Sequence, residues 1–141
     1  MDNPADTLKT LLEENWSLTD EGLRKADITF STSWVRDDFI HPHVTITEVG
    51  DNRVPWELGS ADKKHVDVYA VDLWYRFRLS EEDGRSALWE MRKEVLRIIK
   101  ANYTGLSGIN WLENVGFIRR LDDVPNKILR TRIPASAIYI Q

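Results

Sequence analysis

The chain has 141 residues, of which 42% are hydrophobic and 30% are charged, and its formal net charge at pH 7 is −4. This length suits one domain with a real core, and the acidic balance argues against a general nucleic-acid binder. No cysteine is present, which excludes disulfides, thiol nucleophiles and cysteine-held metal sites. No apolar run approaches the roughly 20 residues of a membrane span, and the acidic start of the chain lacks a signal-peptide pattern.

A short helix is predicted after Asn3, which suits an N-cap and is followed by Pro4 in the first turn. Alternating apolar and polar residues predict a strand over residues 28–35 and a second strand that begins behind Pro42. The alternation then disappears, so we expect a long loop at about residues 50–64. Loops of that length tend to be functional or disordered.

Residues 65–79 predict the central strand, because the odd positions from Tyr69 to Leu79 are all apolar. The even positions begin apolar and become charged, so we expect the second face of the sheet to be covered over part of its length. A long helix follows at once, with Ser80 as its N-cap and Gly105 near its end. Its expected core stripe contains Leu88, Met91, Val95 and Ile98 or Ile99. Its opposite face is expected to be solvated and carries Glu90, Arg92, Lys93, Glu94, Arg97 and Lys100.

Two closing strands are predicted over residues 117–121 and 128–140. Pro134 removes one ladder donor, so the last strand is expected to lie at an edge, or to be bulged or broken there. The predicted fold is a single α+β domain over residues 1–141. It has a mainly antiparallel twisted sheet with one long and one short helix packed on it, in α-β-β-β-α-β-β order.

The sequence gives little sign of catalysis. His41 and His43 lie near Asp37 and Asp38 and suggest a metal site, but Pro42 breaks the regular geometry and solvated turn residues are the better interpretation. The acids at 81–83 are explained by the start of the helix. We therefore predict no enzyme activity, no cofactor and no bound metal.

The arginines form a more informative pattern. Arg76 and Arg78 share one face of the central strand, and Arg130 and Arg132 share one face of the last strand. Three interpretations stay open: cross-strand pairing with Asp72, Asp122 and Asp123, a surface between subunits, or a local nucleic-acid patch. The six tryptophans indicate core and interface packing.

The order of elements has a known counterpart. The features are the docked first helix, the strand pair ending at 43–47, the long loop, and residues 71–75 running into the helix that holds Trp89, Leu96 and Ile99. A short glycine-containing link and two closing strands complete them. This arrangement covers most of the chain and resembles the tail-terminator, or tail-completion, proteins of tailed bacterial and archaeal viruses and their prophage copies.

The resemblance implies a structural protein without catalysis or cofactor. Its members form a homo-hexameric ring that caps the finished tail tube, stops its growth and joins the tail to the head connector. The implied partners are further copies of the chain, the tail tube protein and the connector protein, with no membrane. DNA would slide through an acidic ring without specific binding. The implied location is the host cytoplasm during assembly and then the virion tail.

By the same analogy, the long loop reaches toward the tube or a neighbouring subunit. The expected interface residues are Arg53, Trp56, Leu58, Arg76, Arg78, Arg130 and Arg132. The alternative is a small α/β ligand-binding or regulatory domain without catalysis. It predicts a concave pocket between helix and sheet near Trp74 and Trp89.

Overall fold

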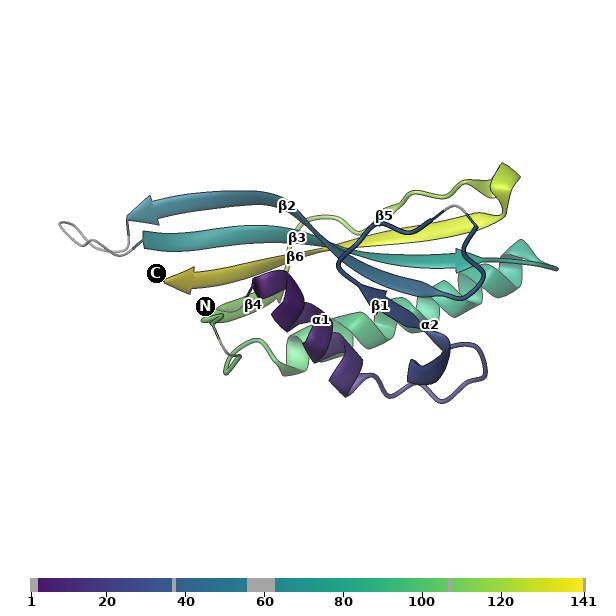
Figure 1. The fold of residues 1–141 in the computed structure, drawn as a ribbon, viewed down its shortest axis with the longest axis horizontal. Helices are drawn as coiled ribbons and strands as arrows, with labels where there is room; N and C mark the ends of the chain where they lie inside the picture. The colour runs from purple at the N-terminus through teal and green to yellow at the C-terminus, as the bar shows by residue number, and fades with distance from the viewer. Residues whose placement is uncertain (1–2, 37, 56–62, 107, 141) are drawn as a thin grey trace.

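A computed structural model describes residues 3–36, 38–55, 63–106 and 108–140, with the backbone alone at 51–55 and 63. Among these residues, two helices pack on one six-stranded, mostly antiparallel sheet, so the predicted α+β class is confirmed (Figure 1). The helices are α1 (Pro4–Asn15) and α2 (Glu81–Ala101). The strands are β1 (Thr29–Ser31), β2 (His43–Pro55), β3 (Lys63–Arg76), β4 (Trp111–Asn114), β5 (Arg119–Arg120) and β6 (Ile128–Ile140).

The sheet is built around its two long central strands. The strand order is β1-β2-β3-β6-β4, and β5 also pairs with β6. β1 runs parallel to β2, whereas the remaining pairs are antiparallel. β3 and β6 pair over their full length, from Arg76 with Ile128 to Lys64 with Ile140. They form the floor on which the helices lie.

The main core lies between this floor and the helices. Tyr69, Val71 and Leu73 of β3 are buried on the face predicted to be apolar, and Met91 and Val95 of α2 are fully buried against the same core. α1 packs on β1 and β2, while α2 packs on β3, β6 and β4. Figure 1 shows both helices on one side of the sheet. Alternation at period two in the strand and the helical stripe together specify this packing.

Both predicted N-caps are present. Asn3 Oδ1 accepts a hydrogen bond from Ala5 N at 2.9 Å, and Ser80 Oγ accepts one from Asp83 N at 3.4 Å. These short polar residues fix where both helices begin. The expected C-cap at Gly105 is wrong, because α2 ends three residues earlier, at the C-cap Asn102. Gly105 does have a left-handed conformation, with φ +83°, in the link after the helix.

The predicted loop over residues 50–64 is wrong at both ends. β2 continues to Pro55 and β3 begins at Lys63, so most of this stretch belongs to two paired strands. The register shifts between Glu48 and Gly50, and such a bulge reverses which residues face the core. That reversal is why the sequence alternation disappears there. Trp56 and Leu58 lie outside the described residues.

The predicted strand over residues 28–35 is also too long, since β1 ends at Ser31. β1 and β2 are parallel neighbours, and parallel strands need a crossover rather than a hairpin. The described residues between β1 and β2, 32–36 and 38–42, belong to that crossover. It places Trp34 and Val35 on the second face of the sheet, opposite the helices.

The closing strands differ from the prediction in two places. β4 was not predicted. Leu112 is its one buried residue, so the strand shows no alternation of buried and exposed positions. The strand expected over residues 117–121 is reduced to β5, and Phe117 before it is 86% exposed. Both strands are short additions to the outer edge of β6.

Of the three outcomes expected at Pro134, the break and the bulge do not occur, because β6 and its register with β3 continue through it, whereas the edge position is found locally. The Pro134 carbonyl accepts hydrogen bonds from Val115 N at 3.2 Å and Asn114 Nδ2 at 2.7 Å, on the side away from β3. A residue's N–H and C=O point to the same side of a strand. The missing donor therefore faces the outer edge, between the stretches of β6 that pair with β5 and β4.

Glu94 corrects the expectation of a solvated outer face on α2, because it is only 4% exposed. Its Oε2 accepts hydrogen bonds from Ser17 N at 3.0 Å and Ser17 Oγ at 2.7 Å, and Arg97 Nε donates to its Oε1. Burial raises the pKa of Glu94, but the hydrogen bonds from Ser17 and Arg97 outweigh it, and the pKa lies below its ordinary value. The Glu94 carboxylate therefore links Ser17, which follows α1, to helix α2.

Candidate functional site

The predicted arginine pattern is explained first by pairing inside the molecule. Asp72 of β3 is fully buried on the second face of the sheet. Its carboxylate accepts hydrogen bonds from Arg130 Nη2 at 2.7 Å and from Arg132 Nε and Nη2 at 2.9 and 3.1 Å. These hydrogen bonds to Asp72 raise the pKa of Arg132. The predicted cross-strand pairing with Asp72 is therefore confirmed, and one carboxylate partly neutralises two guanidinium groups.

Two tryptophans enclose one of these arginines. The Arg130 guanidinium carbon lies 4.7 Å from the Trp34 ring centroid and 4.4 Å from the Trp74 centroid, within the range of cation–π attraction. Trp74 Nε1 also donates to Thr45 Oγ1 at 2.9 Å. The crossover thus covers the charged end of the second face.

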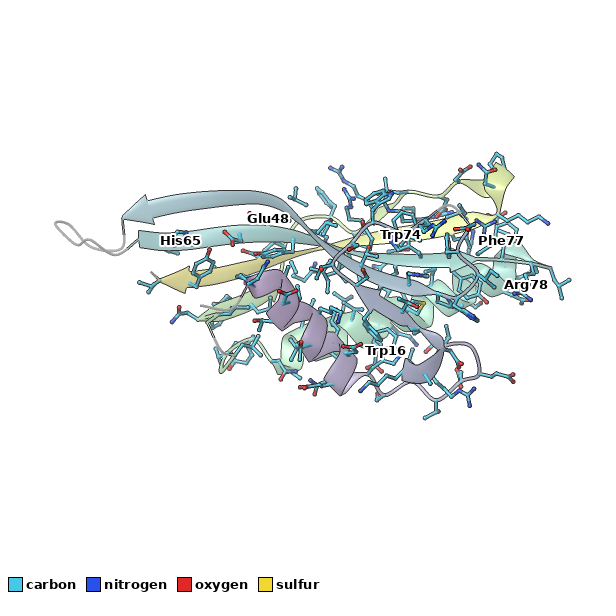
Figure 2. All side chains as sticks on the ribbon, viewed as in Figure 1. Trp16, Glu48, His65, Trp74, Phe77 and Arg78 are labelled. Atoms are coloured by element: carbon cyan, nitrogen blue, oxygen red, sulfur yellow. The ribbon has the colours of Figure 1, made fainter. Side chains whose placement is uncertain are left out.

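The remaining predicted interface residues are divided between this cluster and other parts of the molecule. Arg76 lies over the Phe39 ring at 5.1 Å, under the same crossover. Arg78 is exposed in the turn between β3 and α2, at the end of the molecule opposite the projecting strands (Figure 2). The backbone of Arg53 lies in β2, but its side chain is outside the description. The single arginine-bearing surface suggested by the sequence is therefore divided.

Asp122 is a second predicted partner of the arginines. It accepts hydrogen bonds from Arg85 Nη1 at 3.1 Å, Arg120 Nη2 at 3.0 Å and the backbone N of Arg130 at 3.0 Å. Burial raises the pKa of Asp122, but these three donors outweigh it and lower the pKa. The carboxylate ties α2 to the outer edge of β6, so its pairing is confirmed as well.

A polar cluster that sequence reasoning missed lies near the far end of the central strands. Tyr69 Oη and Tyr139 Oη both donate to Asp67 Oδ2 at 3.1 Å, and His65 stacks on Tyr139 with ring centroids 4.7 Å apart. Burial raises the pKa of the Tyr69 hydroxyl, and the neighbouring Asp67 adds to the effect. The alternation of the strands could have indicated this cluster, because His65, Asp67, Tyr69 and Tyr139 all occupy odd positions of β3 and β6. This network stiffens the sheet where it leaves the helices.

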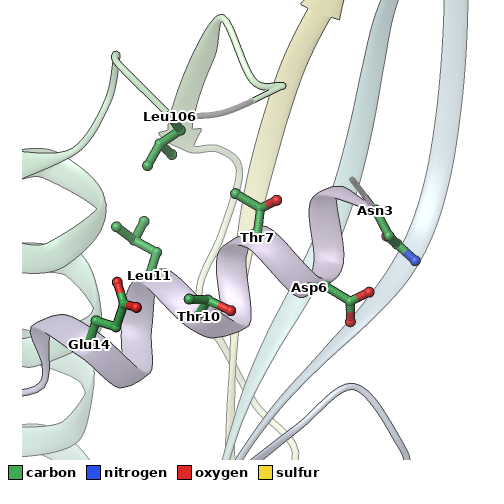
Figure 3. Close-up of a pocket in the computed structure, with 7 residues that line it drawn as sticks. All are labelled: Asn3, Asp6, Thr7, Thr10, Leu11, Glu14 and Leu106. Atoms are coloured by element: carbon green, nitrogen blue, oxygen red, sulfur yellow. The ribbon is translucent and has the colours of Figure 1, made fainter. Parts of the chain in front are cut away.

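The ligand pocket required by the alternative function is not formed where it was expected. Trp74 is 7% exposed and packs on the second face, whereas Trp89 belongs to α2 on the other side of the sheet. The two rings therefore cannot line one cavity between helix and sheet. Figure 3 shows a different depression, of about 360 Å³, beside α1. Its walls include Asp6, Glu14 and Leu106, and it is open to solvent.

A more apolar surface lies between the C-terminal half of α2 and β4. It is an open groove of about 560 Å³, here called the α2–β4 groove. Its apolar walls are Leu96, Ile99, Tyr103, Trp111 and Leu112. Tyr103 and Trp111 meet edge to face with centroids 5.0 Å apart, and they are 48% and 40% exposed. Large half-exposed rings of this kind mark contact surfaces more often than isolated exposed leucines do.

The edge of β4 beside this groove is partly closed. Leu112 N donates to the Tyr103 carbonyl at 2.9 Å, so the chain after α2 occupies that stretch of the edge. β1 pairs with residues 43–45 of β2, and within the described ranges no strand pairs with the outer edge of β2 from residue 46 onward. The sheet therefore offers its longer open edge on the β2 side.

Comparison with known proteins adds no assignment. The chain matches no protein-family model and no curated protein sequence. No group of three or more metal-ligating side chains occurs in the part of the chain that the structure describes. Neither described helix is long and apolar enough to cross a membrane.

Proposed function

We propose that this chain is a structural subunit of a viral or prophage tail, which forms a ring that caps the tail tube and joins it to the head connector. The observation that carries the proposal is the arm, defined as β2 from Gly50, β3 up to Val68 and β6 from Ser136. Its strands stay paired as far as Pro55 with Lys63 and Lys64 with Ile140. Figure 1 shows them extending past both helices.

An arm of this kind suits contact with another chain. Its backbone is ordered by pairing, and the polar cluster around Asp67 fixes its base. The outer edge of β2 presents backbone donors and acceptors over the same stretch, and such an edge can accept an added strand. Exposed Val49, at the bulge, marks where this open edge begins to project. The arm therefore supports the expected reach toward a tube or a neighbouring subunit.

The net charge of −4 supports the remaining part of the proposal. A ring of acidic subunits repels the phosphate backbone, so DNA passes through its opening without adhering. The hexameric state follows the resemblance of the element order to tail-terminator proteins.

The first test is assembly. Light scattering between low and high micromolar concentration should give the mass of a hexamer, and electron microscopy should show particles with a central hole. Added tail tube protein should bind to these rings at one end. A protein that stays monomeric at every concentration, with and without the tube protein, contradicts the proposal.

The second test removes the β2 and β3 part of the arm beyond Asp51 and Asp67, and keeps β6 and the rest of the chain. Residues 52–66 are replaced by Asn-Gly, which closes a two-residue hairpin between Asp51 and Asp67. We expect a folded protein that no longer caps tail tubes, measured as tubes that continue to grow. Normal tube capping by this folded variant would show that the arm has no part in the function.

A further inference from the structure

The α2–β4 groove has apolar walls and a charged residue on each side. Lys100 lies on its helix side and Glu113 on its strand side. Tyr103 and Trp111 are 48% and 40% exposed in the isolated chain. Covering these rings would remove apolar surface from water and therefore favours an apolar occupant.

The same chain carries a side chain suited to this groove at the other end of α2. Leu79, in the turn between β3 and α2, is 97% exposed, more than any other large hydrophobic residue of the described ranges. Ile40 is 58% exposed and lines the same depression as Leu79. Figure 2 places Phe77 and Arg78 of this turn at the tip of the molecule. The turn is thus an apolar projection with no cover of its own.

The turn that holds Leu79, like the groove, carries charges of both signs. Arg78 precedes Leu79, and Glu81, Glu82 and Asp83 follow it in the first turn of α2. Arg78 is complementary in charge to Glu113 of the groove, and the acidic turn is complementary to Lys100.

Phe117, the other strongly exposed ring at 86%, is a poorer occupant. It is followed closely by Arg119 and Arg120, which have the same sign as Lys100. These charges favour the turn that holds Leu79 over Phe117 as the occupant beside Lys100.

We propose that the β3–α2 turn of one copy fills the α2–β4 groove of the next, with Leu79 against Tyr103 and Trp111. This inference rests on the proposed function, because it specifies which surfaces meet when copies assemble. α2 has 21 residues and is about 30 Å long at 1.5 Å per residue, so a copy cannot fill its own groove. The contact is head-to-tail, and its repetition closes a ring or extends a filament.

Cysteine cross-linking tests this contact directly, because the chain contains no cysteine. Leu79→Cys and Tyr103→Cys, the groove residue that Leu79 contacts in the proposed arrangement, are made as separate variants. A disulfide requires Cα atoms within about 7 Å. We expect a disulfide-linked dimer when the two variants are mixed under mild oxidation, and none with either variant alone. Phe117→Cys, at a residue that is 86% exposed, should not link to Tyr103→Cys.

A second measurement uses association without a covalent bond. Leu79→Asp should weaken self-association roughly 10- to 100-fold, as expected for losing one buried leucine. Phe117→Asp, a change at the other strongly exposed ring, should leave self-association unchanged. Arg78→Glu and Glu113→Arg should each weaken it, and the double variant should recover most of the loss because the pair is restored with reversed charge.

The outcomes separate this inference from the function on which it rests. Rings that form without the mixed disulfide, and that tolerate Leu79→Asp, contradict the inference and leave the proposed function standing. Cross-links of Leu79→Cys with itself would indicate a two-fold arrangement and also contradict it. A protein that is monomeric throughout contradicts both.

Discussion

The connection between Glu94 and Ser17 provides a quantitative test of the fold. The Glu94 side chain is 2% exposed and accepts three hydrogen bonds, from Ser17 N, Ser17 Oγ and Arg97 Nε. Hydrogen bonds to a charged group contribute about 1.5–3 kcal/mol each. Ser17 and Arg97 are largely exposed and regain water when Glu94 is removed. We therefore expect Glu94→Ala to lower the free energy of unfolding by about 2–3 kcal/mol, near the lower limit for a broken buried pair.

The assay is thermal and urea unfolding of three variants. For a chain of this length, about 1 kcal/mol corresponds to roughly 3–4 °C, so Glu94→Ala should melt about 6–12 °C below the parent. Glu94→Gln keeps an acceptor for Ser17 and should lose about half as much. The matched control is Glu90→Ala. Glu90 Oε1 lies 2.9 Å from Lys93 Nζ, but both side chains are about half-exposed. Removing this ion pair should change the free energy of unfolding by less than about 0.5 kcal/mol. Equal losses for Glu94→Ala and Glu90→Ala would refute this account of Glu94.

The pH dependence has a definite sign. The pKa of Glu94 is lowered in the folded protein. The stabilisation that its carboxylate provides is therefore fully present above its pKa in the unfolded chain, about 4.3. That stabilisation is lost as the pH falls through the lower pKa of the folded protein. The difference in stability between the parent and Glu94→Ala should therefore be constant from about pH 5 to 7 and shrink below about pH 4. A difference that grows on acidification would contradict the hydrogen-bonded carboxylate.

Three further substitutions test other parts of the fold. Asp72→Ala leaves Arg130 and Arg132 without their carboxylate and should cost about 3–5 kcal/mol in urea unfolding, whereas the exposed Asp38→Ala should cost almost nothing. Gly84→Ala should lower the melting temperature although alanine favours helices, because the new Cβ would lie 2.7 Å from Leu129 Cδ1 in the packed core; a stabilised variant would refute the close approach. Lys127→Gly should raise stability by about 1 kcal/mol, because Lys127 has φ +61°. An unchanged or lower urea midpoint would argue against strain at that residue.

The sequence predicts those parts of the fold in which one period dominates. Tyr69, Val71 and Leu73 of β3 and the stripe of α2 are buried as expected, because their periods of two and 3.6 are uninterrupted. The predicted strand over residues 65–79 is too long at its end, because β3 stops at Arg76 and Leu79, expected on the apolar face, is 97% exposed in the turn that follows. The distal half of β2 is missed because a single bulge near Gly50 reverses the alternation. The crossover over Trp74 is missed because nothing local in residues 32–42 indicates that β1 and β2 run parallel.

The candidate surfaces also divide into features that the sequence predicts and features that it does not. The pairing of Arg130 and Arg132 with Asp72 follows from face parity and was among the open interpretations. The α2–β4 groove could not be predicted, because it depends on Tyr103 and Trp111 meeting after an irregular link. Tertiary packing decides which side chains remain exposed, and hydrophobic periodicity carries no information about that packing.

The central pairing of β3 with β6 has a kinetic consequence. Every residue pair in that ladder is separated in sequence by the whole of α2 and the two short edge strands. The β2–β3 hairpin and α2 involve near neighbours and can form early, whereas the middle of the sheet must wait for a distant segment to arrive. During that interval the bare inner edge of β3 is open to the wrong strand, including one from another molecule. Refolding yield should therefore decline as protein concentration rises, even under conditions in which the finished molecule is stable.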